Sequence, residues 1–152
     1  MKRATVCLVA AMMVIFGVVL ISQAATFEDA KAMVEKTAAF WKANGKDKTI
    51  AEVNKPHGQF VKGDLYVVIL DFNGNVLANG GHPGLVGLNQ LELKDPNGKY
   101  FNKEQIEVDR TKGVGTVEMV FSNPVTGKVQ PKTNYIRRVE GTEYLILSGA
   151  FH

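Results

Sequence analysis

The amino-acid sequence predicts an α+β fold, in which about five antiparallel strands form a sheet and helices pack against it. One observation is a long helical periodicity shortly after the N-terminus. A second is a strand, a tight turn and a return strand in the middle of the chain. The third is a run of three strand patterns at the end, joined by turn-like segments. Helices that are separated from a meander of strands are typical of this class.

Residues 1–24 are set apart from this domain by their composition. A basic start is followed by an uninterrupted apolar run of 16 residues, Val6–Ile21, and then by the small residues Ser22 and Ala24. This order predicts a secretory signal peptide over 1–24 and a single domain over 25–152. The alternative is an uncleaved N-terminal tether, although the run is shorter than the roughly 20 residues of a membrane span. Either way we expect a periplasmic or secreted domain.

The charge and cysteine content exclude several classes of protein. The chain carries 18 basic and 15 acidic side chains, and without Lys2 and Arg3 the net charge falls from +3 to +1. No basic excess therefore points to nucleic acid. The single cysteine, Cys7, lies in the predicted signal. The domain itself can use neither a disulfide nor a thiolate site.

The predicted first helix covers Thr26–Gly45. Its apolar face consists of residues at helical spacing: Phe27, Ala30, Val34, Ala38 and Trp41. Thr26 and Asp29 form the pattern of a capping box, and Gly45 is a typical residue after a helix end. The following "DKTIAEVNKP" predicts a short helical turn that ends before Pro56.

The clearest strand pattern is Leu65–Leu70. This run is apolar on both faces, which predicts a central strand that is covered on both sides. Asn73-Gly74 is a typical hairpin turn, and Val76–Ala78 begins the return strand.

A long irregular stretch follows over Asn79–Gly98, with five glycines and two prolines. Its several leucines argue against disorder, so we expect it to fold over the sheet as a lid or pocket wall. A helix is then predicted over 99–113, followed by three strands within Gly115–Phe151.

Enzyme signatures are weak. Two of the three histidines, His57 and His82, lie in predicted loops, and His152 is the last residue. No pair of histidines has zinc-ligand spacing, and neither Ser122 nor Ser148 lies in a nucleophile elbow. Two segments, "DPNGK" and "DFNGN", resemble calcium loops but are more typical of turns. We therefore expect no catalytic residue, metal or cofactor, although a Ser-His-Asp hydrolase stays open as a third hypothesis.

A small-ligand pocket is better supported. Such a site combines apolar walls with a few convergent polar groups. Four tyrosines could supply the walls: Tyr66, Tyr100, Tyr135 and Tyr144. Lys132 or Arg137 could meet a carboxylate, or both could be solvated strand residues, as Lys128 and Arg138 are expected to be.

The geometry of the last strands limits this pocket. Lys132 and Tyr135 differ by three positions, so a regular strand places them on opposite faces. Both reach one pocket only if the strand begins irregularly near Pro131. His82, in "GGHPG", could equally contact a ligand or be solvated.

The segments "GDLYVVILDFNGNVLANGGHPGLVGLNQLELKDPNGKYF" and "GVGTVEMVFSNPVTGKVQPKTNYIRRVEGTEYLILSGAF" together resemble a single Cache domain of the bacterial extracytoplasmic type. The resemblance covers nearly all of 25–152. It implies a PAS-like antiparallel sheet of about five strands after a long helix, with a pocket between the sheet and the covering loop. Lys132 and Tyr135 then become pocket residues. The resemblance places pocket walls around His82 and in "GKYF", which holds Tyr100 and Phe101.

Cache domains are sensory modules that bind small organic acids or amino acids, so the resemblance implies a binding protein for such a ligand. No second apolar segment or output domain follows the last strand. We therefore expect a protein that carries a ligand or presents it to a membrane-bound sensor or transporter. The alternative is an interaction partner with no ligand of its own. A homodimer through the N-terminal helix would then need an exposed apolar stripe, for example Met33, Ala39 and Phe40.

Overall fold

The computed structural model describes residues 24–152, so the predicted signal peptide lies, apart from Ala24, outside the described residues. The helices in this range are α1 (Phe27–Asn44), α2 (Lys46–Val53), the 3-10 helix η1 (Pro83–Leu85) and α3 (Phe101–Lys112). The strands are β1 (Val61–Lys62), β2 (Leu65–Tyr66), β3 (Val68–Asp71), β4 (Val76–Asn79), β5 (Val114–Ser122), β6 (Val129–Arg138) and β7 (Tyr144–Phe151).

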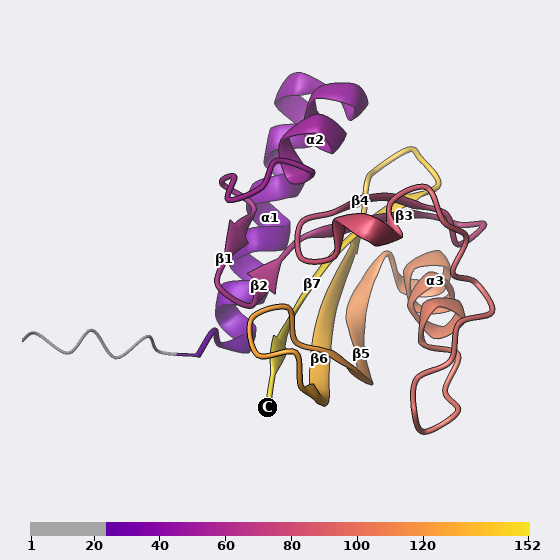
Figure 1. Cartoon of the computed structure of the whole chain (residues 1–152). Coiled ribbons are helices and arrows are strands. Elements are labelled where there is room, and N and C mark those ends of the chain that lie inside the picture. The colour runs from indigo at the N-terminus through magenta and orange to yellow at the C-terminus, as the bar shows by residue number, and fades with distance from the viewer. Residues whose placement is uncertain (1–23) are drawn as a thin grey trace, which may run out of the picture.

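A five-stranded antiparallel sheet forms the middle of the domain, with the strand order β4-β3-β7-β6-β5. The helix α1 lies on one face and α3 on the other, as Figure 1 shows. Successive side chains along each strand point to opposite faces of the sheet, and they pack into two separate cores. The predicted α+β class and five-stranded antiparallel sheet are confirmed.

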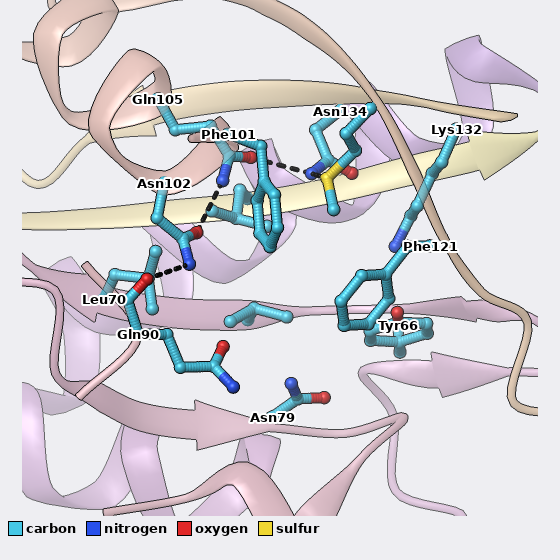
Figure 2. A pocket seen from close by; sticks show the side chains of 13 residues that line it. Tyr66, Leu70, Asn79, Gln90, Phe101, Asn102, Gln105, Phe121, Lys132 and Asn134 are labelled. Carbon is cyan, nitrogen blue, oxygen red and sulfur yellow. Dashed lines mark hydrogen bonds between the residues drawn. The ribbon is translucent and has the colours of Figure 1, made fainter. Parts of the chain in front are cut away.

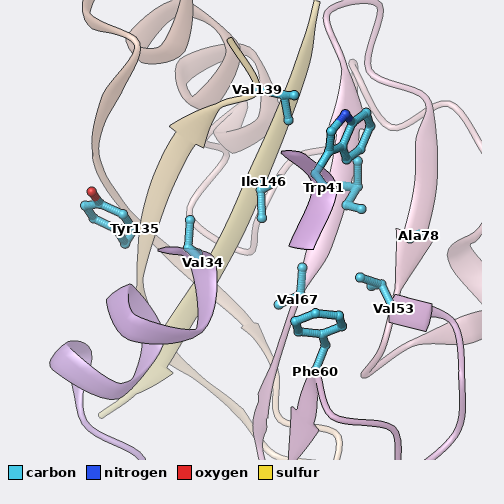
Figure 3. Close-up of a cluster of buried hydrophobic side chains, with 10 residues drawn as sticks. Val34, Trp41, Val53, Phe60, Val67, Ala78, Tyr135, Val139 and Ile146 are labelled. Atoms are coloured by element: carbon cyan, nitrogen blue, oxygen red, sulfur yellow. The ribbon is translucent and has the colours of Figure 1, made fainter. Parts of the chain in front are cut away.

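The core on the α1 face joins the helix to β3, β6 and β7 (Figure 3). Its fully buried members include Val34 of α1, Ile69 of β3 and Ile146 of β7. The helix begins as its capping box predicts, since Thr26 Oγ1 accepts from the Asp29 amide at 3.1 Å. Met33 and Phe40 pack partly against this core, while Ala39 is exposed, and a dimer through this helix stays a prediction.

The predicted strand Leu65–Leu70 is buried throughout but is interrupted in pairing at Val67. Its first part, β2, pairs with the two-residue strand β1. Its second part, β3, lies between β4 and β7, and is the central, doubly covered strand that was predicted.

Residues 80–100, which we call the covering segment, cross the α3 face of the sheet from one edge to the other. At one edge the segment pairs with β4, where the Val76 amide donates to the Leu88 carbonyl at 3.0 Å and the Gly87 amide to the Val76 carbonyl at 2.8 Å. Leu91 of this segment packs against the core of the α3 face and Gln90 lines a cavity there, so the segment forms part of a pocket wall, one of the two roles expected for it.

At the opposite edge, side chains of the covering segment hold the outward-facing backbone of β5. Asp95 Oδ2 accepts from the Val120 amide at 3.1 Å, and Lys99 Nζ donates to the Glu118 carbonyl at 2.6 Å. These bonds satisfy backbone groups that an edge strand would otherwise leave unpaired. They also close the space between the segment, α3 and the sheet.

Candidate functional site

A cavity lies on the α3 face, enclosed by the sheet, α3 and the covering segment (Figure 2). Its free volume is about 30 Å³, which is room for about one water molecule. The lining is mainly apolar and amide-bearing, with one charged side chain: Tyr66, Val68, Leu70, Asn79, Gln90, Phe101, Asn102, Gln105, Met119, Phe121, Lys132, Asn134 and Leu147.

Lys132 is the charged residue of this lining. The alternation of β6 turns Lys132, Asn134 and Ile136 to the α3 face, and Lys132 is only 3% exposed. Its Nζ lies 4.0 Å from the ring centre of Tyr66 and 4.8 Å from that of Phe151. Within residues 24–152 this ammonium group has no hydrogen-bond or ion-pair partner, and no Asp or Glu lines the cavity.

Two opposing effects act on that ammonium group. The aromatic rings favour the charged form by about 2 kcal/mol when desolvated. Burial of an unpaired cation costs several kcal/mol, so burial prevails. It lowers the pKa of Lys132 to about 7, although the carboxylate of Asp64 acts in the opposite direction. Lys132 therefore lines the cavity without an anion to pair with its ammonium group.

Three amide side chains form a hydrogen-bonded chain on the neighbouring wall. Asn134 Nδ2 donates to Gln105 Oε1 at 2.7 Å, and Gln105 Nε2 donates to Asn102 Oδ1 at 2.8 Å. Asn102 Nδ2 in turn donates to the backbone carbonyl of Gln90 at 3.0 Å. This chain ties β6, α3 and the covering segment together around the cavity.

The strand β7 contributes a glycine next to this chain because there is no room for a side chain. A Cβ atom at Gly149 would lie 2.1 Å from Asn134 Oδ1. That oxygen is buried and has no hydrogen-bond partner among the described residues. Gly149 therefore allows Asn134 to turn inward and direct its amide nitrogen at Gln105.

Further donors face the cavity from β2 and β4. Tyr66 is 1% exposed, and burial together with the nearby Asp64 carboxylate raises the pKa of its hydroxyl, which stays protonated and able to donate. Asn79 Oδ1 accepts from the amides of Gly81 and His82, at 3.1 and 2.8 Å. This leaves the amide nitrogen of Asn79 on the cavity side (Figure 2).

His82 lies behind the aromatic wall and does not line the cavity. Its Nε2 lies 3.0 Å from the carbonyl oxygen of Ser122, and its ring meets those of Tyr66 and Phe121 edge-on. Burial lowers the pKa of His82, the Ser122 carbonyl raises it, and the positive charge of Lys132 lowers it further. The result is a half-buried histidine that is neutral at pH 7.

The structure brings together three of the six predicted site residues, since Lys132, Tyr66 and Phe101 all line the cavity. His82 contacts Tyr66 from outside. Tyr100 does not reach the cavity: it is 37% exposed, and its ring lies beneath the ammonium groups of Lys94 and Lys103.

Tyr135 lies on the opposite face of the sheet, among the residues of the α1 core (Figure 3). Its hydroxyl donates to Glu35 Oε1 at 3.0 Å. The pairing of β6 with β7 is regular from Lys132 to Arg138, so no irregularity near Pro131 turns the two side chains to one side. The prediction that Lys132 and Tyr135 share a pocket is wrong, because strand alternation prevails.

The two arginines of β6 each form an ion pair with a helix, although Arg138 was expected to be a solvated strand residue. Arg137 binds Glu35 on α1, and this hydrogen bond holds the pKa of Glu35 below its ordinary value. Arg138 Nε donates to Asp109 Oδ2 at 3.1 Å, and Asp109 on α3 is fully buried. The strand thus ties a helix to each face of the sheet.

Sequence reasoning missed the amide chain. Beside Phe101 and Ile106, α3 buries the amide side chains of Asn102 and Gln105. Their spacing of three was the available signal, because residues at i and i+3 share a helix face. Asn134, two positions after Lys132, could have been found from strand alternation alone.

No group of three or more metal-ligating side chains occurs in the part of the chain that the structure describes. Over the same residues, no helix has both the length and the apolarity to cross a membrane.

A family model for the single Cache domain, described as Single Cache domain 2, matches residues 21–152. The chain therefore belongs to the single Cache domain family. Cache domains are extracytoplasmic sensory modules that bind small ligands.

Solved structures of sensor domains share the fold. A methyl-accepting chemotaxis protein from Vibrio parahaemolyticus RIMD 2210633 is 20% identical, with a TM-score of 0.67 over 82% of this chain and 86% of that one. A periplasmic sensor domain of a chemotaxis protein is 20% identical, with a TM-score of 0.64 over 82% and 89%. A Cache chemosensory domain studied for carboxylic acid recognition is 19% identical, with a TM-score of 0.64 over 82% and 87%.

Proposed function

We propose that this protein binds a short carboxylic acid in the cavity on the α3 face, with the ligand's carboxylate paired to Lys132. The observation that carries the proposal is a buried lysine without an anionic partner, in a lining that holds no other charge. A carboxylate would supply the missing partner and form a charge-assisted hydrogen bond. The Tyr66 hydroxyl and the Asn79 amide are further donors for its oxygens.

The rest of the lining restricts the chemical class and the size of the ligand. The apolar side chains of Val68, Leu70 and Leu147 suit a short carbon chain. No carboxylate lines the cavity to receive an ammonium group, which favours organic acids over amino acids. With free volume for about one water molecule, the covering segment or the side chains beneath it must shift to admit any acid.

The comparisons support a sensory or ligand-presenting role outside the cytoplasm. The neighbouring structures include a periplasmic sensor domain and a Cache chemosensory domain that recognises a carboxylic acid. We propose that this chain acts in the periplasm or outside the cell, where it presents its ligand to a membrane-bound sensor or transporter.

A thermal-shift panel tests the proposal. The purified protein is heated with formate, acetate, propionate, lactate, glycine and alanine in turn. A ligand that binds the native state stabilises it by about 2.7 kcal/mol at 100 times its Kd. We expect a concentration-dependent rise in Tm with at least one of the organic acids. No shift with any member of the panel would refute the proposal.

A matched pair of variants assigns the site. Lys132→Met keeps the length and apolar stem of the side chain but removes the charge, and should abolish the shift. Lys128→Met removes an exposed lysine of the same hairpin and should leave the shift unchanged. An unchanged shift in Lys132→Met would remove Lys132 from the site.

A further inference from the structure

The surroundings of Lys132 determine its charge in the empty cavity. Three titratable groups face it: Asp64 from the β1–β2 turn, Tyr66 from β2 and His82 from the covering segment. None of them neutralises the ammonium group. Asp64 is beyond ion-pair distance and accepts instead from Asn123 Nδ2 at 3.2 Å. Tyr66 presents its ring and stays protonated, and His82 is neutral or repels a positive charge.

We propose that Lys132 is a neutral amine in the empty cavity near and above neutral pH, and that it takes up one proton when a carboxylate binds. This proposal rests on the proposed function, because it concerns the same cavity and the same ligand. Binding would then be coupled to pH, and the domain would respond to the acid together with a proton.

The geometry supports this exchange. The amine lies against two aromatic rings, 3% exposed and without an anion, so its charged form has little hydration and no charged partner. A bound carboxylate supplies the partner and restores the charged form. The proton comes from solvent, and the product is an ammonium–carboxylate pair with no covalent change. A pKa of about 7 in the empty site places the exchange in the physiological range.

The sign of the pH dependence follows from linkage. Below about pH 7 the lysine is already protonated, so the Kd of the acid is constant. Above it the empty site must gain a proton to bind, and the Kd rises toward tenfold per pH unit. From pH 7 to pH 9 the affinity should fall by about 50-fold, and by at least about tenfold if the pKa lies a unit higher.

Isothermal titration calorimetry measures the proton directly. Acetate and propionate are titrated into the purified protein at pH 8.5, in two buffers whose ionisation enthalpies differ widely. The difference in apparent binding enthalpy gives the number of protons taken up. We expect close to one proton per bound acid, together with the fall in affinity from pH 7 to pH 9. An affinity that is constant over this range, without proton uptake, would overturn the proposal while leaving the proposed function intact.

Two variants identify the titrating group. His82→Gln keeps a donor for the Ser122 carbonyl and should retain the pH dependence, because His82 is already neutral in this range. Lys128→Met should also retain it. If His82→Gln abolishes the pH dependence, the histidine rather than the lysine is the coupled group and the proposal fails.

A second measurement does not require a ligand. Lysine side-chain resonances of the empty protein are followed by NMR from pH 5 to pH 11, and Lys132 is assigned by comparison with Lys132→Met. We expect the resonance that is absent from Lys132→Met to titrate near pH 7, well below the ordinary pKa of a lysine. Titration of Lys132 with the others would overturn the proposal even if no acid of the panel binds.

Discussion

Lys132 is the residue on which the account depends most. Its position costs folding free energy, because an unpaired amine in an apolar cavity loses hydration without gaining a partner. A residue that is unfavourable for stability and aimed into a cavity is typical of a binding site. The same burial that destabilises the empty domain would strengthen the interaction with an anion, since the local dielectric constant is low.

The stability cost of Lys132 can be measured by replacing it with methionine. At pH 6 the wild-type protein must bury a charged lysine, so Lys132→Met should raise the free energy of unfolding by about 2 kcal/mol or more. The native pKa of Lys132 is lowered to about 7. Between that pH and about 10.4 the unfolded state holds more protons, so wild-type stability rises with pH.

The difference in the free energy of unfolding between Lys132→Met and wild type should therefore decrease from pH 6 to pH 10. Urea denaturation at both pH values measures it, with Lys128→Met as the control for loss of an exposed charge. A methionine variant that is less stable than wild type at pH 6 would show that the lysine is stabilised by a contact not identified here.

Tyr135 provides a test with a residue outside the proposed site, since it lies on the α1 face. Tyr135→Phe removes the hydrogen bond to Glu35 and should cost about 1 kcal/mol of stability, as measured by urea denaturation. The affinity for an acid that binds the wild-type protein should change less than twofold. A large loss of affinity would indicate that the acid binds on the α1 face, and would contradict the site proposed on the α3 face.

At the residue scale, sequence patterns predicted part of the site. Tyr66 was named as an aromatic wall from its residue type, whereas Lys132 stayed open between a pocket and a solvated position until the resemblance to Cache domains favoured the pocket. Tyr135 was assigned wrongly because a family resemblance was given more weight than strand alternation. Asn102 and Gln105 were missed because amides carry no distinctive signal until a helix face is fixed by its packing.

At the scale of elements, the covering segment contributes to the wall of the cavity through Gln90. It is held at the β5 edge by Asp95, which also accepts from the amides of Asn97 and Lys99, at 2.9 and 3.0 Å. Burial alone would raise the pKa of Asp95, but these amides and that of Val120 lower it. The carboxylate thus stabilises the turn and fastens it to the sheet at neutral pH.

Replacing Asp95 with alanine should loosen this end of the covering segment. The loss of three backbone hydrogen bonds should cost about 2 kcal/mol. Hydrogen exchange should accelerate at the Val120 amide more than at Val117, which faces β6. Glu107→Ala, at an exposed position of α3, is the control. Equal protection of Val120 in wild type and Asp95→Ala would show that the segment is held by other contacts.

Elements with strong local signals were predicted well. The capping box of α1 and the Asn73-Gly74 turn are both local features, and each marks the element it was expected to mark. The two-residue strand β1 could not be predicted, because only its pairing with β2 distinguishes it from loop. Element existence follows from local sequence, whereas short pairings depend on tertiary packing.

At the scale of the whole molecule, the sheet separates two functions. The α1 face is a closed core fixed by Trp41, Phe60 and the Glu35–Arg137 pair. The α3 face holds the cavity, covered by a segment with little regular structure. Such a division gives a rigid scaffold on one side and a ligand-accessible layer on the other, which suits a sensory domain. The antiparallel arrangement was predictable from sequence, but the closure of both sheet edges by one segment was not.

The most direct test of the central claim is a two-dimensional amide NMR titration of the purified protein with acetate and propionate. The account predicts that the amides with changed chemical shifts cluster around the cavity, at Tyr66, Asn79, Gln105 and residues 132–134. The amides of α1, including those that contact Tyr135, should change little. Perturbations centred on the α1 face, or no saturable change with either acid, would contradict it.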